Sequence, residues 1–204
     1  MIYENAKRGV KMIYTAEILE LIAALLSSAA MSFKDVSFTT GLVGALVALV
    51  LVIVAAVKEI KGLSIAGKDE KGYKNALILV IVWFVASLVS AALPALFPSM
   101  KASPLEFGSD LINLLVLVGV IQATNVLLRN KGEEETVKKG NIALCVNVAA
   151  LFISSALEAF IQVSELNDEK KVIAFVVTGL VYAVVLLVGY IKYLVYLKKA
   201  SEKL

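Results

Sequence analysis

Two glutamates inside an apolar stretch are the residues of this sequence whose type and spacing best suit chemistry. The stretch is YTAEILELIAALLSS, residues 14–28, and it contains Glu17 and Glu20. Residues three positions apart lie on the same face of a helix. Carboxylates in such a setting bind a cation, exchange protons or, when protonated, donate hydrogen bonds to a neighbouring helix. Which of these applies depends on what surrounds the helix.

The composition indicates a membrane. Of the 204 residues, 60% are hydrophobic and 18% are charged, whereas soluble domains have about 45–50% apolar and about 25% charged residues. The charged residues are clustered, and the apolar runs between them have the length of roughly 20 residues that a helix needs to cross a bilayer. We therefore expect an all-α, polytopic membrane protein that forms a single integral membrane domain over residues 1–204.

Six membrane-spanning helices are predicted from the apolar runs that charge, glycine or proline bounds. Two of the runs, Gly41–Val57 and Asn75–Leu93, contain no charged residue. The first apolar run follows Lys7, Arg8 and Lys11 and has no clear processing site, so the first helix is expected to be retained. The predicted helices cover residues 12–31, 40–60, 74–97, 109–128, 141–162 and 172–196.

The basic residues predict the orientation. With six spans, sixteen of the 20 lysines and arginines fall on the side that holds both termini, and the other four are Lys34, Lys101, Lys170 and Lys171. Cytoplasmic segments carry the excess of basic residues. We therefore expect a multi-pass protein of the plasma (cytoplasmic) membrane with both termini inside. Tyr190, Tyr193 and Tyr196 lie beside lysines near the end of the sixth helix, and they are expected to anchor it at the interface.

An internal repeat is suggested by three glycines, Gly9, Gly72 and Gly140, which each follow a basic segment and begin an odd-numbered helix. Aligning them gives three helical hairpins in parallel orientation, residues 9–71, 72–139 and 140–204. The alternative is that membrane helices resemble one another because they use the same few residue types. If the repeat is real, the odd helices are expected to lie innermost.

The same alignment predicts an inward face on each odd helix, because positions that step by three and four share one side. Small residues and hydroxyl groups on such a face allow close helix packing. The face consists of Glu17, Glu20, Ala24 and Ser27 in the first helix, Val80, Trp83, Ser87 and Ser90 in the third, and Val148, Leu151, Ser155 and Glu158 in the fifth.

The candidate binding site is a central polar cavity in which Glu20, with Glu17, holds a cation or a proton. Trp83 stacks on a ligand there, or it simply fills core volume. The remaining candidates are the uncharged polar residues Gln122, Asn125 and Asn147. Two alternatives remain open: protonated glutamates that only hold helices together, or a first helix shifted so that Glu17 lies at the headgroup level.

Several activities are excluded by what the sequence lacks. It has no histidine and a single cysteine, Cys145, which is expected to be a small core residue. Zinc sites built on histidine and histidine general bases are therefore impossible. The motifs GxxxxGK[ST], HExxH and GxSxG are absent, so coupling to ATP would need another subunit. We expect no enzyme, no cofactor, no metal site and no nucleic-acid partner.

Two functions fit these features. The first is a small transport or solute-capture protein whose partners are the lipid bilayer and a small solute or cation. The second is a non-transporting scaffold, immunity factor or assembly partner, whose polar residues only hold helices together and which engages a membrane or cytoplasmic protein.

Overall fold

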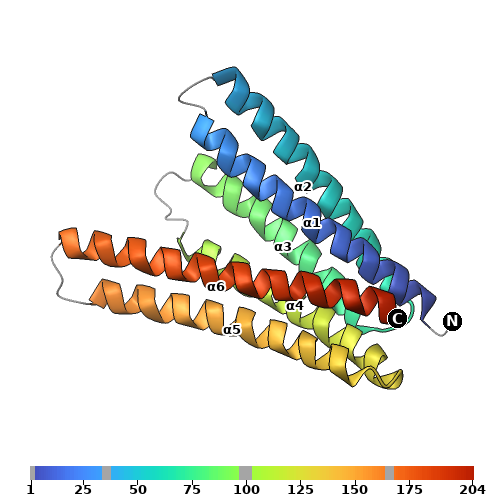
Figure 1. The fold of residues 1–204 in the computed structure, drawn as a ribbon. Helices are drawn as coiled ribbons and strands as arrows, with labels where there is room; N and C mark the ends of the chain where they lie inside the picture. The colour runs from blue at the N-terminus through green and yellow to red at the C-terminus, as the bar shows by residue number, and fades with distance from the viewer. Residues whose placement is uncertain (1–2, 34–37, 97–102, 164–167) are drawn as a thin grey trace.

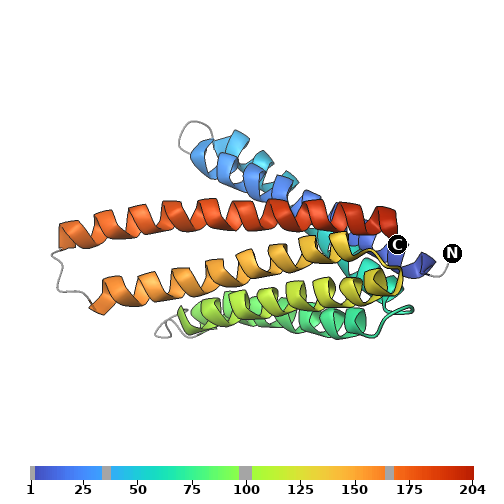
Figure 2. The same ribbon diagram turned by 60° about the horizontal axis from the view of Figure 1, so that its bottom comes forward.

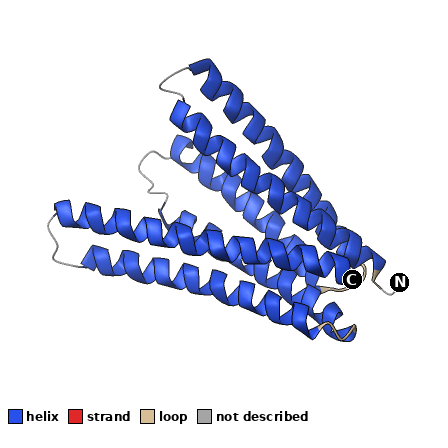
Figure 3. Ribbon diagram, in the orientation of Figure 1, coloured by secondary structure: helices blue, strands red, loops and turns tan. Residues whose placement is uncertain are grey.

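The chain folds into helices joined by short connections (Figure 3). The computed structural model describes the backbone of residues 3–33, 38–96, 103–163 and 168–204. Side chains are described for residues 3–32, 38–86, 111–153 and 172–204, apart from residue 175. Within these ranges there is no strand, and the prediction of an all-helical chain is confirmed. Lys34, Lys101 and the side chains of Ser87, Ser90, Ser155, Glu158, Lys170 and Lys171 lie outside the described residues.

The described residues form six helices, and most of these extend further than the sequence predicted. For example, α1 begins eight residues earlier than expected, and α6 continues seven residues further. Lysine and glutamate are good helix formers, so a helix continues past the apolar run that a charge appears to end. The helices are α1 (Glu4–Phe33), α2 (Phe38–Ala66), α3 (Gly72–Leu96), α4 (Ser103–Asn130), α5 (Glu134–Val163) and α6 (Asp168–Lys203).

Five of these helices contain described stretches long and apolar enough to cross a membrane, namely those in α1, α2, α4, α5 and α6. The described part of α3, Gly72–Ala86, is a shorter apolar helix. Many large apolar side chains are exposed, such as Leu46 at 54%, Val50 at 58% and Val184 at 61%. Water does not tolerate so large an apolar surface, whereas lipid does. The chain therefore has the features of a multi-pass membrane protein.

Both termini lie at one end of the bundle, together with residues 67–71 and 131–133, and this end is called the terminal end (Figure 1). Figures 1 and 2 show the helices close together there and spreading apart toward the other end. Neighbours in the chain are neighbours in space, and α6 also packs against α1. The helices therefore surround a central space.

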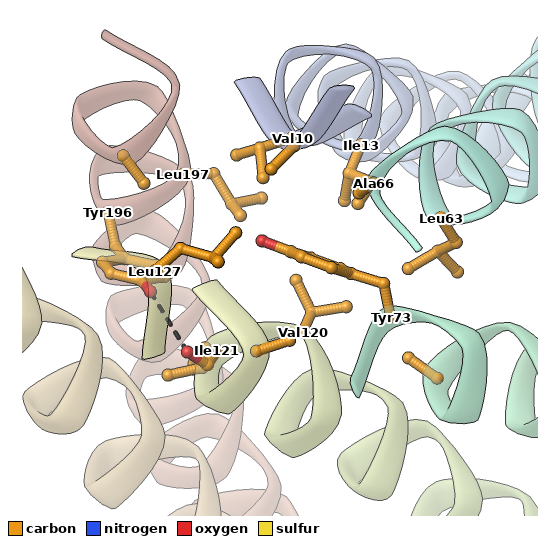
Figure 4. Packing of buried hydrophobic residues seen from close by; sticks show 14 of the residues in the cluster. Val10, Ile13, Leu63, Ala66, Tyr73, Val120, Ile121, Leu127, Tyr196 and Leu197 are labelled. Carbon is orange, nitrogen blue, oxygen red and sulfur yellow. Dashed lines mark hydrogen bonds between the residues drawn. The ribbon is translucent and has the colours of Figure 1, made fainter. Parts of the chain in front are cut away.

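The packed core lies at the terminal end. Val10 and Ile13 of α1, Leu63 of α2, Tyr73 of α3 and Tyr196 of α6 have no exposed surface. They belong to one cluster with residues of α4 and α5 (Figure 4). Tyr193 and Tyr196 are 2% and 0% exposed, so the prediction that they anchor α6 at the interface was wrong. Their rings are buried because α6 packs on α1 and α5 along this face.

Close contacts between helices follow one rule in the first two hairpins. A Cβ atom added at Gly9 would lie 2.7 Å from Ala66 Cβ, and one added at Gly62 would lie 3.0 Å from an Ile13 side-chain atom. In the second hairpin, Gly72 and Gly119 of α3 and α4 meet Ala123 and Ala76 in the same way, at 2.8 and 3.2 Å. In these two hairpins, each helix thus carries a glycine and, four residues further on, the residue that the glycine of the other helix contacts.

The third hairpin has a related arrangement with larger partners. Gly140 of α5 packs on the ring of Tyr196, and Gly189 of α6 packs on the amide of Asn147. On each of these two helices, the glycine and the residue that the other helix's glycine contacts are seven residues apart instead of four. All three glycines that the sequence alignment matched therefore pack against the other helix of their own hairpin.

Candidate ligand cavity

A cavity of about 930 Å³ lies in the centre of the bundle, and all six helices contribute to its lining. Its volume falls in the range of roughly 300–1,000 Å³ that is typical of small-molecule sites. The lining includes residues of α4 and of α6, and α6 contributes six of them. The odd helices therefore share the innermost position with even ones, because each hairpin turns both of its helices toward the centre.

The cavity is closed at the terminal end. Val80, Val116 and Tyr193 line the cavity and also belong to the core cluster. Along α1 the lining runs from Glu17 to Ser28. Eleven residues at 1.5 Å each correspond to about 16 Å of depth. The cavity thus extends along α1 away from the terminal end.

Five polar side chains lie at the closed end, and we call them the cavity floor: Glu17, Glu59, Asn147, Tyr190 and Tyr193. The contact between Ile13 and Gly62 brings Glu59 of α2 level with Glu17, one turn further on. The hydroxyl group of Tyr190 donates a hydrogen bond to the backbone carbonyl of Glu17 at 2.6 Å. The contact of Asn147 with Gly189 brings it to the same level. Glu17, Glu59, Asn147 and Tyr190, which come from four different helices, thus lie at about one depth.

The lining carries carboxylates without counter-charge. Glu17, Glu20 and Glu59 line the cavity, and no lysine or arginine among the described residues does. Among the described residues, the only ion pairs join Lys139 to Glu135 and Lys203 to Glu133, both at the terminal end. The described part of the lining is therefore acidic, with no basic side chain beside its three carboxyl groups.

Four of the six candidate residues line the cavity, namely Glu17, Glu20, Trp83 and Asn147. The Asn147 amide donates to the carbonyl oxygen of Ala143 at 2.8 Å. The other two are placed elsewhere: Gln122 is exposed and Asn125 is buried. Of the twelve residues on the predicted inward face, the described ones that line the cavity are Glu17, Glu20, Ala24, Val80, Trp83 and Leu151.

Asn125 belongs to a hydrogen-bond network that joins three helices and is buried except at Asn141. The Tyr196 hydroxyl donates to Asn125 Oδ1 at 2.8 Å, and Asn125 Nδ2 donates to Asn141 Oδ1 at 3.0 Å. Nearby, Tyr73 of α3 and Thr124 of α4 share a hydrogen bond of 2.7 Å between their hydroxyl groups. These polar groups hold helices together at the terminal end.

Removing the Tyr196 hydroxyl should destabilise the protein by about 1–2 kcal/mol, because Asn125 Oδ1 is left buried without its donor. The Tyr196→Phe variant keeps the ring that packs on Gly140. Unfolding in mixed micelles measures the loss. Tyr14→Phe is the matched control, since Tyr14 packs against the core without a described hydrogen bond, and equal stability of the two variants would contradict the role of the network.

Glu59 and the tyrosines of the floor were not among the sequence candidates. Glu59 lies between Lys58 and Lys61, so it reads as part of a charged segment beyond the membrane. No signal in the sequence separates Glu59 from the lysines around it, because the contact of α2 with α1 decides which face of α2 points inward at this depth. Cys145, expected in the core, is exposed, because α5 turns its Asn147 face inward instead.

The geometry defines a class: a helical protein with several helices fit to cross a membrane and an acidic central cavity closed at one end. No family model matches the chain, and neither a curated protein nor a solved structure shows significant similarity to it.

Proposed function

We propose that this protein binds a small solute in its central cavity, as a transporter or capture protein, and that Glu17 and Glu20 serve as a cation or proton site. The observation that carries the proposal is the unpaired acidic lining of a cavity of about 930 Å³. Intramembrane carboxylates are costly unless they face water, a partner or a ligand.

The contrast between two sets of polar residues favours this function over the role of a non-transporting scaffold. Polar residues that hold the helices together, such as Asn125 and Tyr196, are buried and hydrogen-bonded across helices. The carboxylates of Glu17, Glu20 and Glu59 line an open volume instead. A scaffold has no use for such a volume, because close packing would stabilise it more.

The topology that we propose has six membrane spans, with both termini in the cytoplasm of a cell whose plasma membrane holds the protein. Sixteen basic residues at the terminal end support this orientation. We also propose that the chain contains three related hairpins. The matching contacts of Gly9 with Ala66 and of Gly72 with Ala123 support the repeat. The cavity would then open to the outside and be closed to the cytoplasm.

Cysteine accessibility tests the proposal. Ala24 and Ala183 line the cavity, whereas Ala149 is exposed on the bundle surface and lies outside the lining. In a Cys145→Ala background, Ala24→Cys and Ala183→Cys should react at least about tenfold faster with a charged methanethiosulfonate than Ala149→Cys, because the reagent attacks a hydrated thiolate.

The reagent is added to proteoliposomes from either side, with mass spectrometry as the readout. Reaction from the side opposite the termini supports the proposed orientation. If the two cavity cysteines react as slowly as Ala149→Cys, the interior is dry. The scaffold function would then replace the proposed binding function.

A further inference from the structure

We infer that the cavity takes an organic ammonium cation, with its charged head at the cavity floor and its apolar body along the walls; this rests on the proposed function. Charge is the first argument. In the part of the chain that the structure describes, three carboxylates and no basic side chain line the cavity, so an anionic ligand would meet repulsion in a medium of low dielectric constant.

A bare metal ion does not fit this lining. Within the described ranges, no three histidine, cysteine, aspartate or glutamate side chains come close enough together to hold one metal ion. Calcium and magnesium need six or more oxygen ligands within about 2.6 Å. Glutamates that are spread around a volume of about 930 Å³ instead suit a cation of larger size.

Aromatic residues support an ammonium group. Trp83, Tyr182, Tyr190 and Tyr193 all line the cavity, and two of these tyrosines belong to its floor beside Glu17. The hydrogen bond from Tyr190 to the backbone of Glu17 holds its ring at that depth. Aromatic rings attract quaternary and alkylated ammonium ions by cation–π interaction, most strongly when water is excluded.

The walls above the floor indicate an apolar body. Leucines of α1, α4, α5 and α6 are the most frequent residues in them, and Glu20, Asn113 and Ser28 are the polar ones. The lining extends about 16 Å from the floor to Ser28. A proton would need none of this space. A cation with one charged end and an apolar remainder satisfies both the floor and the walls.

Tryptophan fluorescence gives a readout from inside the site, because Trp83 is the single tryptophan of the chain and lines the cavity. The test uses the purified full chain in detergent and three meta-substituted phenols that differ in charge. They are (3-hydroxyphenyl)trimethylammonium, its uncharged isostere 3-tert-butylphenol, and the anion 3-hydroxybenzoate. Empty micelles provide the correction for partitioning.

The ammonium probe should change Trp83 emission saturably and bind at least about tenfold more tightly than the other two. Glu59→Gln should weaken its binding about tenfold or more, because the floor loses a charge while keeping its shape. Glu4→Gln, at an exposed acid on the same helix as Glu17, should leave binding unchanged.

Equal binding of the uncharged isostere would overturn the ammonium assignment while leaving a solute-binding cavity intact. Absence of saturable binding by the ammonium probe, in protein whose cavity cysteines react with aqueous reagent, would also overturn it. Wild-type affinity in Glu59→Gln would remove the floor as the site of the charged head. Unreactive cavity cysteines would instead remove the proposed function itself, so the two failures are distinct.

Discussion

Gly9→Val should destabilise the protein by about 3 kcal/mol or more, which is a loss of over 100-fold in the folding equilibrium. A Cβ atom at Gly9 would lie 2.4 Å from the Gly62 carbonyl oxygen and 2.8 Å from the Ala66 backbone nitrogen. These are backbone atoms that cannot rotate away, so α1 and α2 must separate along the core. Thermal unfolding in detergent measures the effect.

Gly179→Val is the matched control for this variant. Gly179 also lies within a helix, but a Cβ atom there meets nothing within 4 Å. The control should change stability by no more than about 0.5 kcal/mol, as expected of an exposed site. Similar melting temperatures for the two variants would mean that the contact between α1 and α2 is looser than described.

Glu20→Gln should reduce uptake or binding of the ligand at least about tenfold with little change in stability. Glutamine has nearly the same shape but cannot hold a charge or exchange a proton, so the loss is electrostatic. An opposite charge near a partly buried carboxylate contributes up to about 4 kcal/mol at 4 Å. The measurement is uptake into proteoliposomes or Trp83 quenching by the ammonium probe.

Two variants make this result interpretable. Glu4→Gln, outside the cavity, should behave as wild type. Gln122→Ala should also retain binding, because Gln122 is exposed on α4 and lies outside the lining. Undiminished uptake by folded Glu20→Gln protein would remove this carboxylate from the proposed site.

Much of the cavity lining on α1 and α3 was predictable from the sequence. Glu17, Glu20 and Ala24 follow helical spacing, and the alignment of Gly9 with Gly72 carried the face to Val80 and Trp83. This succeeds because helical periodicity defines which residues share a face. An acidic residue in an apolar helix must also turn away from lipid, which selects the inward face.

Residues near the charged helix ends were harder to assign. Glu59 and Tyr190 lie among lysines, where polar residues are common in any membrane protein. Their inward orientation depends on how far α2 and α6 continue past the apolar run. Asn125 was assigned to the cavity for its polarity alone, yet it bonds Tyr196 and Asn141. Hydrogen-bond partners more than 70 residues away cannot be read from local spacing.

The sequence by itself determined the helical class, the apolar length of the helices, and the gathering of basic residues at one end, because these follow from composition and local periodicity. Only the tertiary structure decided that Glu59 joins Glu17 at one depth and that the terminal end is packed while the centre is open. The physical reason is that contacts such as Gly9 with Ala66 set the rotation and height of each helix against its neighbour. That relation between two helices is absent from the pattern of either one.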